Sequence, residues 1–340
     1  MPEWLQTLLA APSRDEGTSF DIGGQPCIIV DGIPRCRTTI SAAQQQTRDA
    51  FGFKWNKRDT FESATSLARM REWLLSRYGD IAAAAWIREY GPLPLVVDAG
   101  CGAGMSAMEL FGPTLRDVRY LGVDISTTIE VARQRFAERA LPGGFLQADI
   151  TNLPLAAESV DVIFSEGVLH HTNSTEAALK SLARLLKPGG RFLFYVYRRK
   201  GPLREFTDDY VRARLQSLSA EDAWRAMEPL THLGIALGEL DATVDVPEPV
   251  DLLGIPAGRV SVQRLFYWHV AKMFYRSDLS FDEMNHINFD WYAPANAHRQ
   301  SPDDVRGWCA ETGLVIEREA IEDAGITVVA RKEAASICAG

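Results

Sequence analysis

The stretch "LVVDAGCGAGMSAM" (residues 95–108) combines a short apolar run, an acidic residue and three glycines at every second position. The β-branched run that ends at Asp98 is typical of a strand buried on both faces of a parallel sheet. Gly100, Gly102 and Gly104 permit a tight turn and a close approach of the backbone to a ligand, and helical spacing resumes behind them. A strand, a glycine loop and a helix N-terminus together predict a site for a nucleotide-like ligand.

Composition limits the kinds of protein that this chain can be. Its 340 residues are 46% hydrophobic and 24% charged, which is enough to bury the core of one large domain or of two modest ones. The formal net charge of −9 and a pI near 5.3 provide no basic field for a phosphate backbone. We therefore expect no nucleic-acid partner and no membrane partner.

The start of the chain and its cysteines bear on the cellular compartment. The first residues, "MPEWLQTLLAAPSRDEG", lack the basic head and long apolar centre of a signal peptide, and no stretch reaches the ~18 apolar residues of a membrane span. A soluble, cytoplasmic protein is expected. The five cysteines are an odd number, so we expect reduced thiols rather than a disulfide framework. They are Cys27, Cys36, Cys101, Cys309 and Cys338.

Two classes of cofactor compete for the glycine loop. A dinucleotide fingerprint has the spacing G-x-G-x-x-G, whereas this loop has G-x-G-x-G preceded by an acid. The segment "DAGCGAG" resembles the first motif of the class I S-adenosylmethionine-dependent methyltransferases. Three further segments extend the resemblance over residues 95–197: "YLGVDIS", "FLQADITNLPLAAESVDVIFSEGVLHHT" and "LLKPGGRFLFYVY". A NAD-type Rossmann unit is the alternative.

The resemblance implies an α/β fold, a Rossmann-like seven-stranded methyltransferase sheet with helices on both faces. Residues 61–199 would form the first part of this core, and residues 301–340 would complete it with a helix and an antiparallel hairpin. The end of the chain agrees with this expectation, because a Ser301 cap and Pro302 precede a helical pattern and two alternating strands follow it.

The resemblance also implies S-adenosylmethionine as the cofactor and assigns residues to it. These residues are Asp98, Gly100, Gly102, Gly104, Asp124, Ile125, Asp149, Ile150, Ser165, Glu166 and Gly167. The glycine loop would pass beneath the methionine part, with Asp98 near its amino group. Asp124 would bind the ribose hydroxyls, and Asp149 with Ile150 would meet the adenine. Residues 165–167 would form the wall towards the methyl acceptor.

A helix cap is the alternative role for each of these acids. The segment "STTIE" (residues 126–130) has the spacing of a capping box, in which Thr127 and Glu130 would satisfy the first turn of a helix. Asp124 precedes that box, so its carboxylate is free for a ligand.

Residues 1–60 precede the core as an extension. The segment "FDIGGQPCIIVDGIPR" has two short alternating runs separated by glycine and proline, which predicts a small hairpin. It resembles the Trm112-like zinc-ribbon segment in front of some bacterial methyltransferases. Only Cys27 and Cys36 lie there, whereas a structural zinc site needs four ligands, so no metal is expected. A long helical pattern over residues 60–90 would then pack on the sheet.

Residues 200–300 separate the two parts of the core, and caps such as Ser280 with Glu283 predict that this insertion is mainly helical. An insertion here lies over the carboxyl ends of the strands, where open α/β sheets bind ligands, so we expect an acceptor-binding cap. Residues 285–299 lack helical or strand periodicity, which predicts a polar loop that lines the site. Its candidate acceptor-binding residues are Trp291, Tyr292, His298 and Arg299.

The expected reaction is transfer of a methyl group from S-adenosylmethionine to a polar or anionic small molecule. A base is needed only where the acceptor is a protonated hydroxyl or amine. His170 and His171, which follow the fourth core strand, are the candidate catalytic residues, and the alternative is that one ring merely holds the loop. An RNA or protein methyltransferase and a catalytically silent cofactor-binding protein are the alternative functions. A homodimer is compatible with the sequence.

Overall fold

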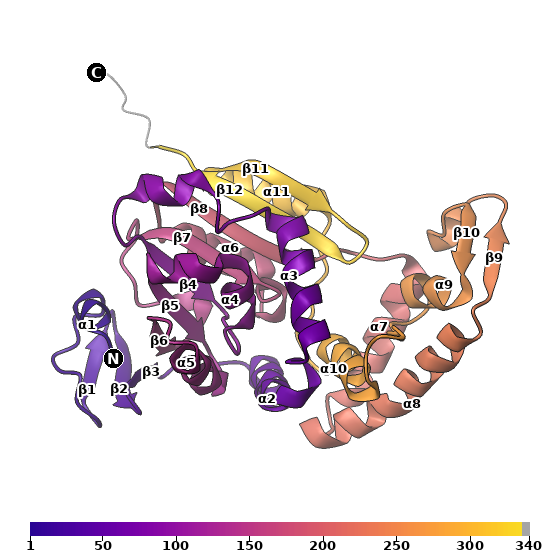
Figure 1. The fold of residues 1–340 in the computed structure, drawn as a ribbon, viewed down its shortest axis with the longest axis horizontal. Helices are drawn as coiled ribbons and strands as arrows, with labels where there is room; N and C mark the ends of the chain where they lie inside the picture. Colours follow the sequence, from indigo (N-terminus) through magenta and orange to yellow (C-terminus); the bar gives the residue numbers. More distant parts are fainter. Residues whose placement is uncertain (335–340) are drawn as a thin grey trace.

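The computed structural model describes residues 1–334, through which a ten-stranded mixed sheet runs (Figure 1). Its strands are β1 (Ser19–Ile22), β2 (Gln25–Val30), β3 (Ile33–Cys36), β4 (Leu95–Ala99), β5 (Arg119–Asp124), β6 (Gly144–Gln147), β7 (Val160–Glu166), β8 (Leu186–Tyr197), β11 (Leu314–Ile321) and β12 (Gly325–Lys332). Their order across the sheet is β1-β2-β3-β6-β5-β4-β7-β8-β12-β11. The strands β6, β5, β4, β7 and β8 lie parallel to one another, whereas β12 lies antiparallel to both β8 and β11.

The seven strands from β6 to β11 form the Rossmann-like methyltransferase sheet that the sequence predicts. β4 lies at its centre, and all five residues of β4 are buried because the run is apolar towards both faces. The chain passes from β4 to β5 and β6 on one side, then crosses to β7 on the other. Strand order therefore reverses beside β4, and a ligand crevice is expected at the carboxyl ends there.

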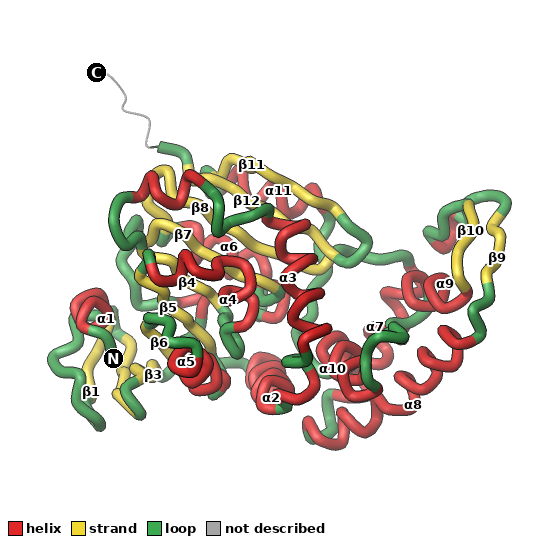
Figure 2. Tube along the Cα trace, viewed as in Figure 1, coloured by secondary structure: helices red, strands yellow, loops and turns green. Residues whose placement is uncertain are grey.

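Helices cover both faces of the sheet (Figures 1 and 2). They are α1 (Glu3–Leu8), α2 (Ala42–Asn56), α3 (Ala64–Tyr78), α4 (Met105–Phe111), α5 (Thr128–Glu138), α6 (Thr175–Ala183), α7 (Pro202–Leu215), α8 (Ala220–Glu239), α9 (Val262–His269), α10 (Phe281–Tyr292) and α11 (Pro302–Glu311). Val96 of β4 packs in one core layer with Leu110 of α4 and Ile129 of α5. Its neighbour Val97 packs in the other layer with Leu179 of α6. In the part of the chain that the structure describes, no helix has the length and apolar character needed to cross a bilayer.

The N-terminal extension joins the main sheet, which corrects the expectation of a two-stranded hairpin. β1, β2 and β3 form a three-stranded antiparallel meander, and β3 lies parallel to β6 with Arg35 opposite Gln147. Arg35 Nη1 donates a hydrogen bond to Gln147 Oε1 (3.0 Å), and its Nη2 contacts Glu130 Oε1 at 2.6 Å. The third strand is only four residues long and contains a proline, so its pattern is too short to reveal it.

Cys27 and Cys36 form a disulfide, which corrects the expectation of reduced thiols at these positions. The two residues lie opposite each other in the register of β2 and β3, with their Cα atoms 4.0 Å apart. A count of cysteines carries no information about this register. Cys101 and Cys309 are buried free thiols, and Cys338 lies outside the described residues.

The helical pattern of residues 60–90 is interrupted at Gly79. α3 ends at Tyr78 because Gly79 adopts a φ of +81°, and a 3-10 turn (Ala85–Tyr90) follows after a short loop. Leu74 of α3 is fully buried, while Met70 and Trp73 are partly buried against the same core layer. The expected packing on the sheet is therefore present, but two elements provide it.

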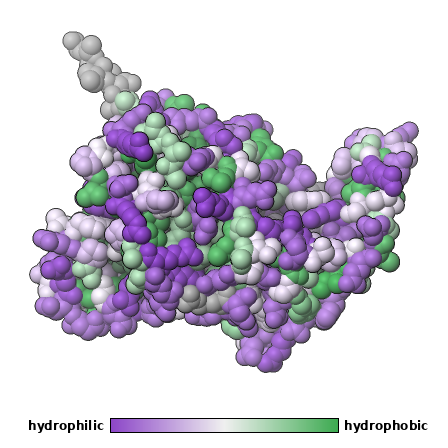
Figure 3. Space-filling view, viewed as in Figure 1, coloured by the Kyte–Doolittle hydropathy of each residue, from purple (hydrophilic) through white to green (hydrophobic). Residues whose placement is uncertain are grey.

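The insertion is mainly helical, as expected, and forms a cap beside the core (Figure 1). β9 (Thr243–Val246) and β10 (Gly258–Ser261) make a hairpin arm that projects from its outer end (Figure 3). α10 contacts α7, α8 and α2, so it joins the cap to the core. The expectation of a loop over residues 285–299 is wrong for its first half, because α10 continues to Tyr292. Eight of the twelve residues of α10 are buried, and a helix buried on most sides carries no amphipathic period.

Candidate active site

A cavity of about 450 Å³ lies where the carboxyl ends of the central strands meet α2, α3 and the cap. From the core loops it is lined by Asp98, Gly100, Cys101, Gly102, Asp124, Ile125, Asp149, Ile150, Glu166, Gly167, Val168 and His171. From the cap it is lined by Arg204, Tyr267, Trp268, Lys272, Phe274, Ile287, Asp290 and Trp291. Most of the sequence-predicted cofactor residues therefore share one cavity with side chains of the insertion.

The glycine loop makes a tight turn at the end of β4. The amide groups of Gly100 and Cys101 both donate to the Val123 carbonyl at 2.8 Å, which holds the loop against β5. Gly100 has a φ of +86°, and a Cβ atom there would overlap the Val168 side chain. A Cβ atom on Gly102 would lie 3.1 Å from Trp55 Nε1. Glycine at both positions lets Val168 and Trp55 pack directly against the loop.

Gly104 has a different place from the other two glycines. It is the N-cap of α4 with a φ of +79°, and it does not line the cavity. A Cβ atom on it would meet Phe136 at 3.2 Å and Ala132 at 3.4 Å. Gly104 thus allows α4 to pack closely against α5.

Asp98 is buried at the end of β4 and lines the cavity. Its Oδ2 accepts a hydrogen bond from the Tyr120 hydroxyl at 2.7 Å. Burial raises the pKa of Asp98 to about 7, aided by the nearby charges of Asp124 and Glu166, although the Tyr120 hydrogen bond lowers it. A cation placed beside this carboxyl would favour its ionised form.

Asp124 joins the end of β5 to the glycine loop. Its Oδ2 accepts from the Gly102 amide at 2.9 Å, and its Oδ1 accepts from the Ser126 amide (2.8 Å) and hydroxyl (2.6 Å). Burial raises the pKa of Asp124, and these hydrogen bonds oppose that shift. Thr127, the N-cap of α5, makes no side-chain cap hydrogen bond, so the predicted capping box is absent.

Asp149 has both of the roles that the sequence left open. Its Oδ1 accepts from the Thr151 amide and hydroxyl, each at 2.8 Å, and thereby caps the 3-10 turn Ile150–Asn152. The residue also lines the cavity beside Ile150, and Ile125 lines the neighbouring wall. The cap leaves Oδ2 of Asp149 without a hydrogen bond from the described residues.

The predicted wall at residues 165–167 divides into a structural and a cavity-lining part. Ser165 is fully buried, donates to the Ala99 carbonyl at 2.8 Å, and does not line the cavity. Glu166 and Gly167 line it. Glu166 accepts from Arg77 Nη1 at 2.9 Å and from the Tyr78 hydroxyl, so α3 holds this carboxylate in place.

The two adjacent histidines have different environments. His170 is fully buried against Tyr197, with ring centroids 3.7 Å apart, and it does not line the cavity. His171 lines the cavity, and its Nδ1 lies 2.6 Å from the Asn296 carbonyl. A carbonyl only accepts, so Nδ1 carries the proton and Nε2 is the basic nitrogen. Burial lowers the pKa of His171 to about 4, despite the nearby charge of Asp290.

The four acceptor-binding candidates are not brought together. Trp291 lines the cavity. Tyr292 is fully buried, where its hydroxyl donates to Asp208 (2.9 Å) and accepts from the Lys272 amide (2.7 Å). His298 and Arg299 line a separate, open hollow instead. Residues 285–299 were expected to form one loop, but their first half belongs to α10. Trp291 and Tyr292 therefore lie on a helix, whereas His298 and Arg299 lie in the segment after it.

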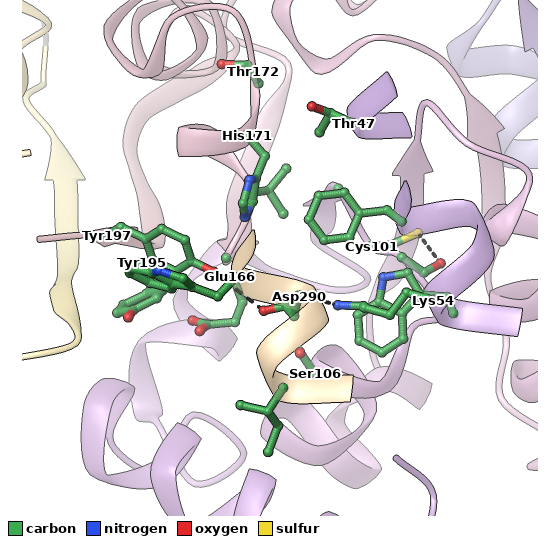
Figure 4. A pocket seen from close by; sticks show the side chains of 18 of the residues that line it. Thr47, Lys54, Cys101, Ser106, Glu166, His171, Thr172, Tyr195, Tyr197 and Asp290 are labelled. Carbon is green, nitrogen blue, oxygen red and sulfur yellow. Dashed lines mark hydrogen bonds and ion pairs between the residues drawn. The ribbon is translucent and has the colours of Figure 1, made fainter. Parts of the chain in front are cut away.

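Several cavity residues were not expected from the sequence. They are Gln44, Thr47, Lys54, Arg77, Tyr195, Tyr197, Lys200, Arg204, Lys272 and Asp290. Lys54 is the clearest case, since its Nζ pairs with Oδ1 of Asp290 inside the cavity (Figure 4). The sequence did contain a signal for these two residues, which is a charge within an apolar segment. The segment is "FGFKW" for Lys54 and "NFDWY" for Asp290. Of the aromatic residues in the first segment, Phe51 and Trp55 line the cavity, whereas Phe53 packs against Phe289.

Comparison with known proteins agrees with this geometry. Residues 97–194 match the family model described as "Methyltransferase domain". The chain contains a class I S-adenosylmethionine-dependent methyltransferase domain. This domain spans the glycine loop, the three acids at or just after the carboxyl ends of β4, β5 and β6, and the strands up to β8.

Similar proteins differ in what their names say they act on. A Bos taurus relative named "Probable tRNA methyltransferase 9B" is 31% identical over 139 residues, which are 38% of this chain and 28% of that protein. An "O-methyltransferase" of Pyrenophora dematioidea is 37% identical over 99 residues, which are 28% of this chain and 36% of that protein. The chain thus spans about a third of the length of these curated relatives.

A solved structure resembles the methyltransferase domain and its surroundings more distantly. It is the magnesium protoporphyrin IX methyltransferase of Synechocystis PCC 6803 with bound S-adenosylhomocysteine, which is 16% identical. The likeness covers 84% of this chain and 98% of that chain, with a TM-score of 0.45.

The residues of the methyltransferase domain fit S-adenosylmethionine. Gly100 and Gly102 line the cavity and carry no side chain, so the backbone of the loop faces it directly. Asp98, Asp124 and Glu166 are buried acids that face the same cavity, and a cofactor with a sulfonium and an ammonium group supplies the compensating positive charge. S-Adenosylmethionine is the cofactor of this domain.

Proposed function

We propose that this chain transfers the methyl group of S-adenosylmethionine to a small-molecule acceptor bound between the core and the cap. The observation that carries the proposal is a continuous cavity, lined at one end by the glycine loop and its acids and at the other by cap side chains. Lys54 of α2 pairs with Asp290 of α10, and both side chains line this cavity. A cavity enclosed by three parts of one chain favours a small molecule over a polymer.

When bound, S-adenosylmethionine supplies an electrophilic methyl group for an in-line displacement. The residues of this chain orient the two reactants and exclude water. Asp124, anchored to Gly102 and Ser126, would hold the ribose, and Glu166, anchored by Arg77, would hold the wall between the two reactants. Good alignment in an enclosed site contributes up to ~7–11 kcal/mol to lowering a barrier of this kind.

His171 is the residue best placed to act on the acceptor from the core. Its Nε2 is unprotonated, and its Nδ1–H is fixed by the Asn296 carbonyl, so the ring presents an acceptor of hydrogen bonds to the cavity. With a pKa of about 4 the imidazole is a weak base, and a general base works best with a pKa near the operating pH. We therefore assign His171 a positioning role, with His170 packed behind it as a structural residue.

An RNA acceptor is the second candidate, because the name of the bovine relative refers to tRNA. The net charge of −9 counts against it, since RNA binding relies on a basic surface. The cap also covers the carboxyl ends of the strands, where a polymer would have to approach.

Calorimetry with the purified protein tests the cofactor part of the proposal. S-Adenosylmethionine and S-adenosylhomocysteine should bind in the micromolar range, and NAD should not. Asp124→Asn should weaken binding roughly tenfold or more, because a charge-assisted hydrogen bond contributes ~1.5–3 kcal/mol. Asp117→Asn, on the exposed loop before β5, is the matched control and should bind like the parent.

Transfer of label tests the acceptor part. The protein is incubated with methyl-labelled S-adenosylmethionine and, in separate reactions, with a cell metabolite extract, total tRNA and total protein. We expect label in a product of the metabolite extract, identified by mass spectrometry. Label that enters only tRNA or only protein would overturn the small-molecule assignment while leaving the methyltransferase activity in place.

A further inference from the structure

The cap end of the cavity has more cationic than acidic side chains. Two of its cations are neutralised, since Lys54 pairs with Asp290 and Arg204 Nε pairs with Asp208 Oδ1 at 2.8 Å. Lys200 and Lys272 line the same part, and neither has a carboxylate within ion-pair distance among residues 1–334. The opposite end carries the acids of the cofactor loops. Charge is therefore divided along the cavity, negative at the core and positive at the cap.

Among these cations, Lys272 is the one whose charge is least compensated by other groups. Its side chain is only 7% exposed to solvent. Its Nζ makes no hydrogen bond to any residue that the structure describes, whereas Lys200 Nζ donates to the carbonyls of Asp323 and Ala324. Burial lowers the pKa of Lys272 to about 8, and Asp290 opposes this shift. A buried ammonium without an acceptor is costly, so an anion that reaches it gains a strong hydrogen bond.

An aromatic surface lies beside the unpaired ammonium. The Trp291 ring has Lys272 Nζ 4.8 Å from its centroid, Arg204 Cζ at 5.3 Å and Lys200 Nζ at 5.6 Å. Its indole nitrogen is buried and has no hydrogen-bond partner in the described structure. Tyr267 and Phe274 line the same part of the cavity. Aromatic walls with cations over one of their rings suit a planar ligand that carries a negative charge.

We propose that the cap end of the cavity is an anion subsite, in which Lys272 binds the carboxylate or phosphate group of a planar acceptor that packs against Trp291. This inference rests on the proposed function, because it takes the bound molecule to be the methyl acceptor. It adds the chemical class of that acceptor and the residue that selects it. The division of charge also keeps the anion away from the acids that face the cofactor.

The test uses the full-length protein saturated with S-adenosylhomocysteine and three probes of one shape, 2-naphthoate, 2-naphthyl phosphate and 2-naphthamide. We expect at least one of the two anions to bind tenfold or more tightly than the neutral amide, as a charge-assisted hydrogen bond predicts. Which anion binds more tightly separates a carboxylate from a phosphate acceptor. Lys272→Met should abolish the preference for the anion, and Lys272→Arg should retain most of it.

Lys57→Met is the matched control. Lys57 Nζ lies 4.7 Å from the centroid of the Trp224 ring, nearly the geometry of Lys272 over Trp291, but it does not line the cavity. This variant should keep the anion preference. The affinity for S-adenosylhomocysteine, measured in every variant, should stay within twofold of the parent and also reports that each variant is folded.

Three results would overturn the subsite. The first is a parent protein that binds no probe or shows no preference for the anions. The second is a preference that survives in Lys272→Met. The third is a loss of S-adenosylhomocysteine affinity in a folded Lys272→Met variant, which would assign the ammonium to the cofactor's own carboxylate. Failure of the parent to bind S-adenosylhomocysteine is a separate result that overturns the proposed function instead.

Discussion

Lys54 of α2 and Asp290 of α10 form an ion pair inside the cavity, although 236 residues separate them in the chain. The Lys54 side chain is 5% exposed and that of Asp290 is 28% exposed. Lys54 also stacks over the Trp55 ring, with its Nζ 3.8 Å from the centroid. One contact thus joins the segment before the methyltransferase domain to the cap that follows it, and both segments become walls of one site.

Removing the acid of this pair should destabilise the protein. Asp290→Asn leaves Lys54 buried with a weaker partner, and the cost should be less than the roughly 3–5 kcal/mol of a fully buried pair because Asp290 retains some exposure. Urea unfolding measures the loss. The double change Lys54→Met with Asp290→Leu should recover most of it, since an apolar pair of similar volume needs no charge compensation. A single Asp290→Asn variant as stable as the parent would contradict this account.

Gly100→Ala should destabilise the domain and weaken cofactor binding. An alanine at a φ of +86° costs roughly 1–2 kcal/mol, and its Cβ atom would overlap the Val168 side chain, which adds roughly 1–3 kcal/mol of overpacking. Gly307→Ala is the control, because Gly307 lies inside α11 with no atom within 4 Å of the added Cβ. It should stabilise the protein by roughly 0.5–1 kcal/mol. Denaturant melts and calorimetry with S-adenosylhomocysteine measure both effects.

Cofactor affinity should rise with pH up to about 7. The carboxyl of Asp98 has its pKa raised to about 7, chiefly by burial, so it is largely neutral in the empty protein at pH 6. A cofactor ammonium nearby requires the ionised form, so binding releases a proton and the affinity increases up to tenfold per pH unit below the raised pKa. Tyr120, Cys101, Asp124 and Glu166 are titratable groups that interact electrostatically with Asp98.

The comparison for this pH effect is Asp98→Asn, which retains an acceptor for the Tyr120 hydroxyl. Its affinity for S-adenosylhomocysteine should be lower than that of the parent at pH 7.5 and nearly constant between pH 5.5 and 7.5. Calorimetry in buffers of different ionisation enthalpy would count the released proton. A parent affinity that does not change over this range would remove Asp98 from the site.

Acid should destabilise the fold through His171. Its folded-state pKa of about 4 lies below the ordinary value of 6.5, so the unfolded chain binds a proton first as the pH falls. Stability that is present above pH 6.5 should therefore decline towards pH 4, and His171→Gln should reduce this dependence. Thermal melts between pH 7 and pH 5 measure it.

The same variant separates positioning from base catalysis. As a positioning residue, His171 should affect the methyl-transfer step by less than the 10²–10⁴-fold that loss of a general base produces. The pH–rate profile of the parent should have no inflection from His171 between pH 5 and pH 8, because the ring is neutral there. A larger loss in the transfer step, with the cofactor affinity unchanged, would make His171 the base.

The core and its cofactor loops could be predicted from the sequence because their signals are local. The apolar run of a buried parallel strand can be recognised within a few residues, and the glycine loop begins directly after β4. Asp124 and Asp149 were found in the same way, as acids directly after apolar runs. Each of these residues reaches the cavity because the carboxyl ends of parallel strands meet at one edge of the sheet.

The acceptor side could not be predicted in the same way. Tyr292 was predicted to be an acceptor-binding residue, but it is buried between Asp208 and the Lys272 amide. Arg299 was assigned the same role, yet it pairs with Glu205 Oε2 at 2.9 Å outside the cavity. The structure places both residues outside the cavity. Tyr292 lies in α10, which is buried on most sides so that its sequence shows no periodic face, and Arg299 lies in the segment after this helix.

The sequence by itself determined the α/β class, the strands of the core and the loops that line the cavity, since each depends on residues that are near neighbours in the chain. Only the tertiary structure decided the Cys27–Cys36 pairing, the third strand of the N-terminal extension, and the joining of Lys54 to Asp290. These contacts depend on register and on the docking of distant segments. The free energy that selects them comes from burial shared by many residues, and no short stretch of sequence encodes it.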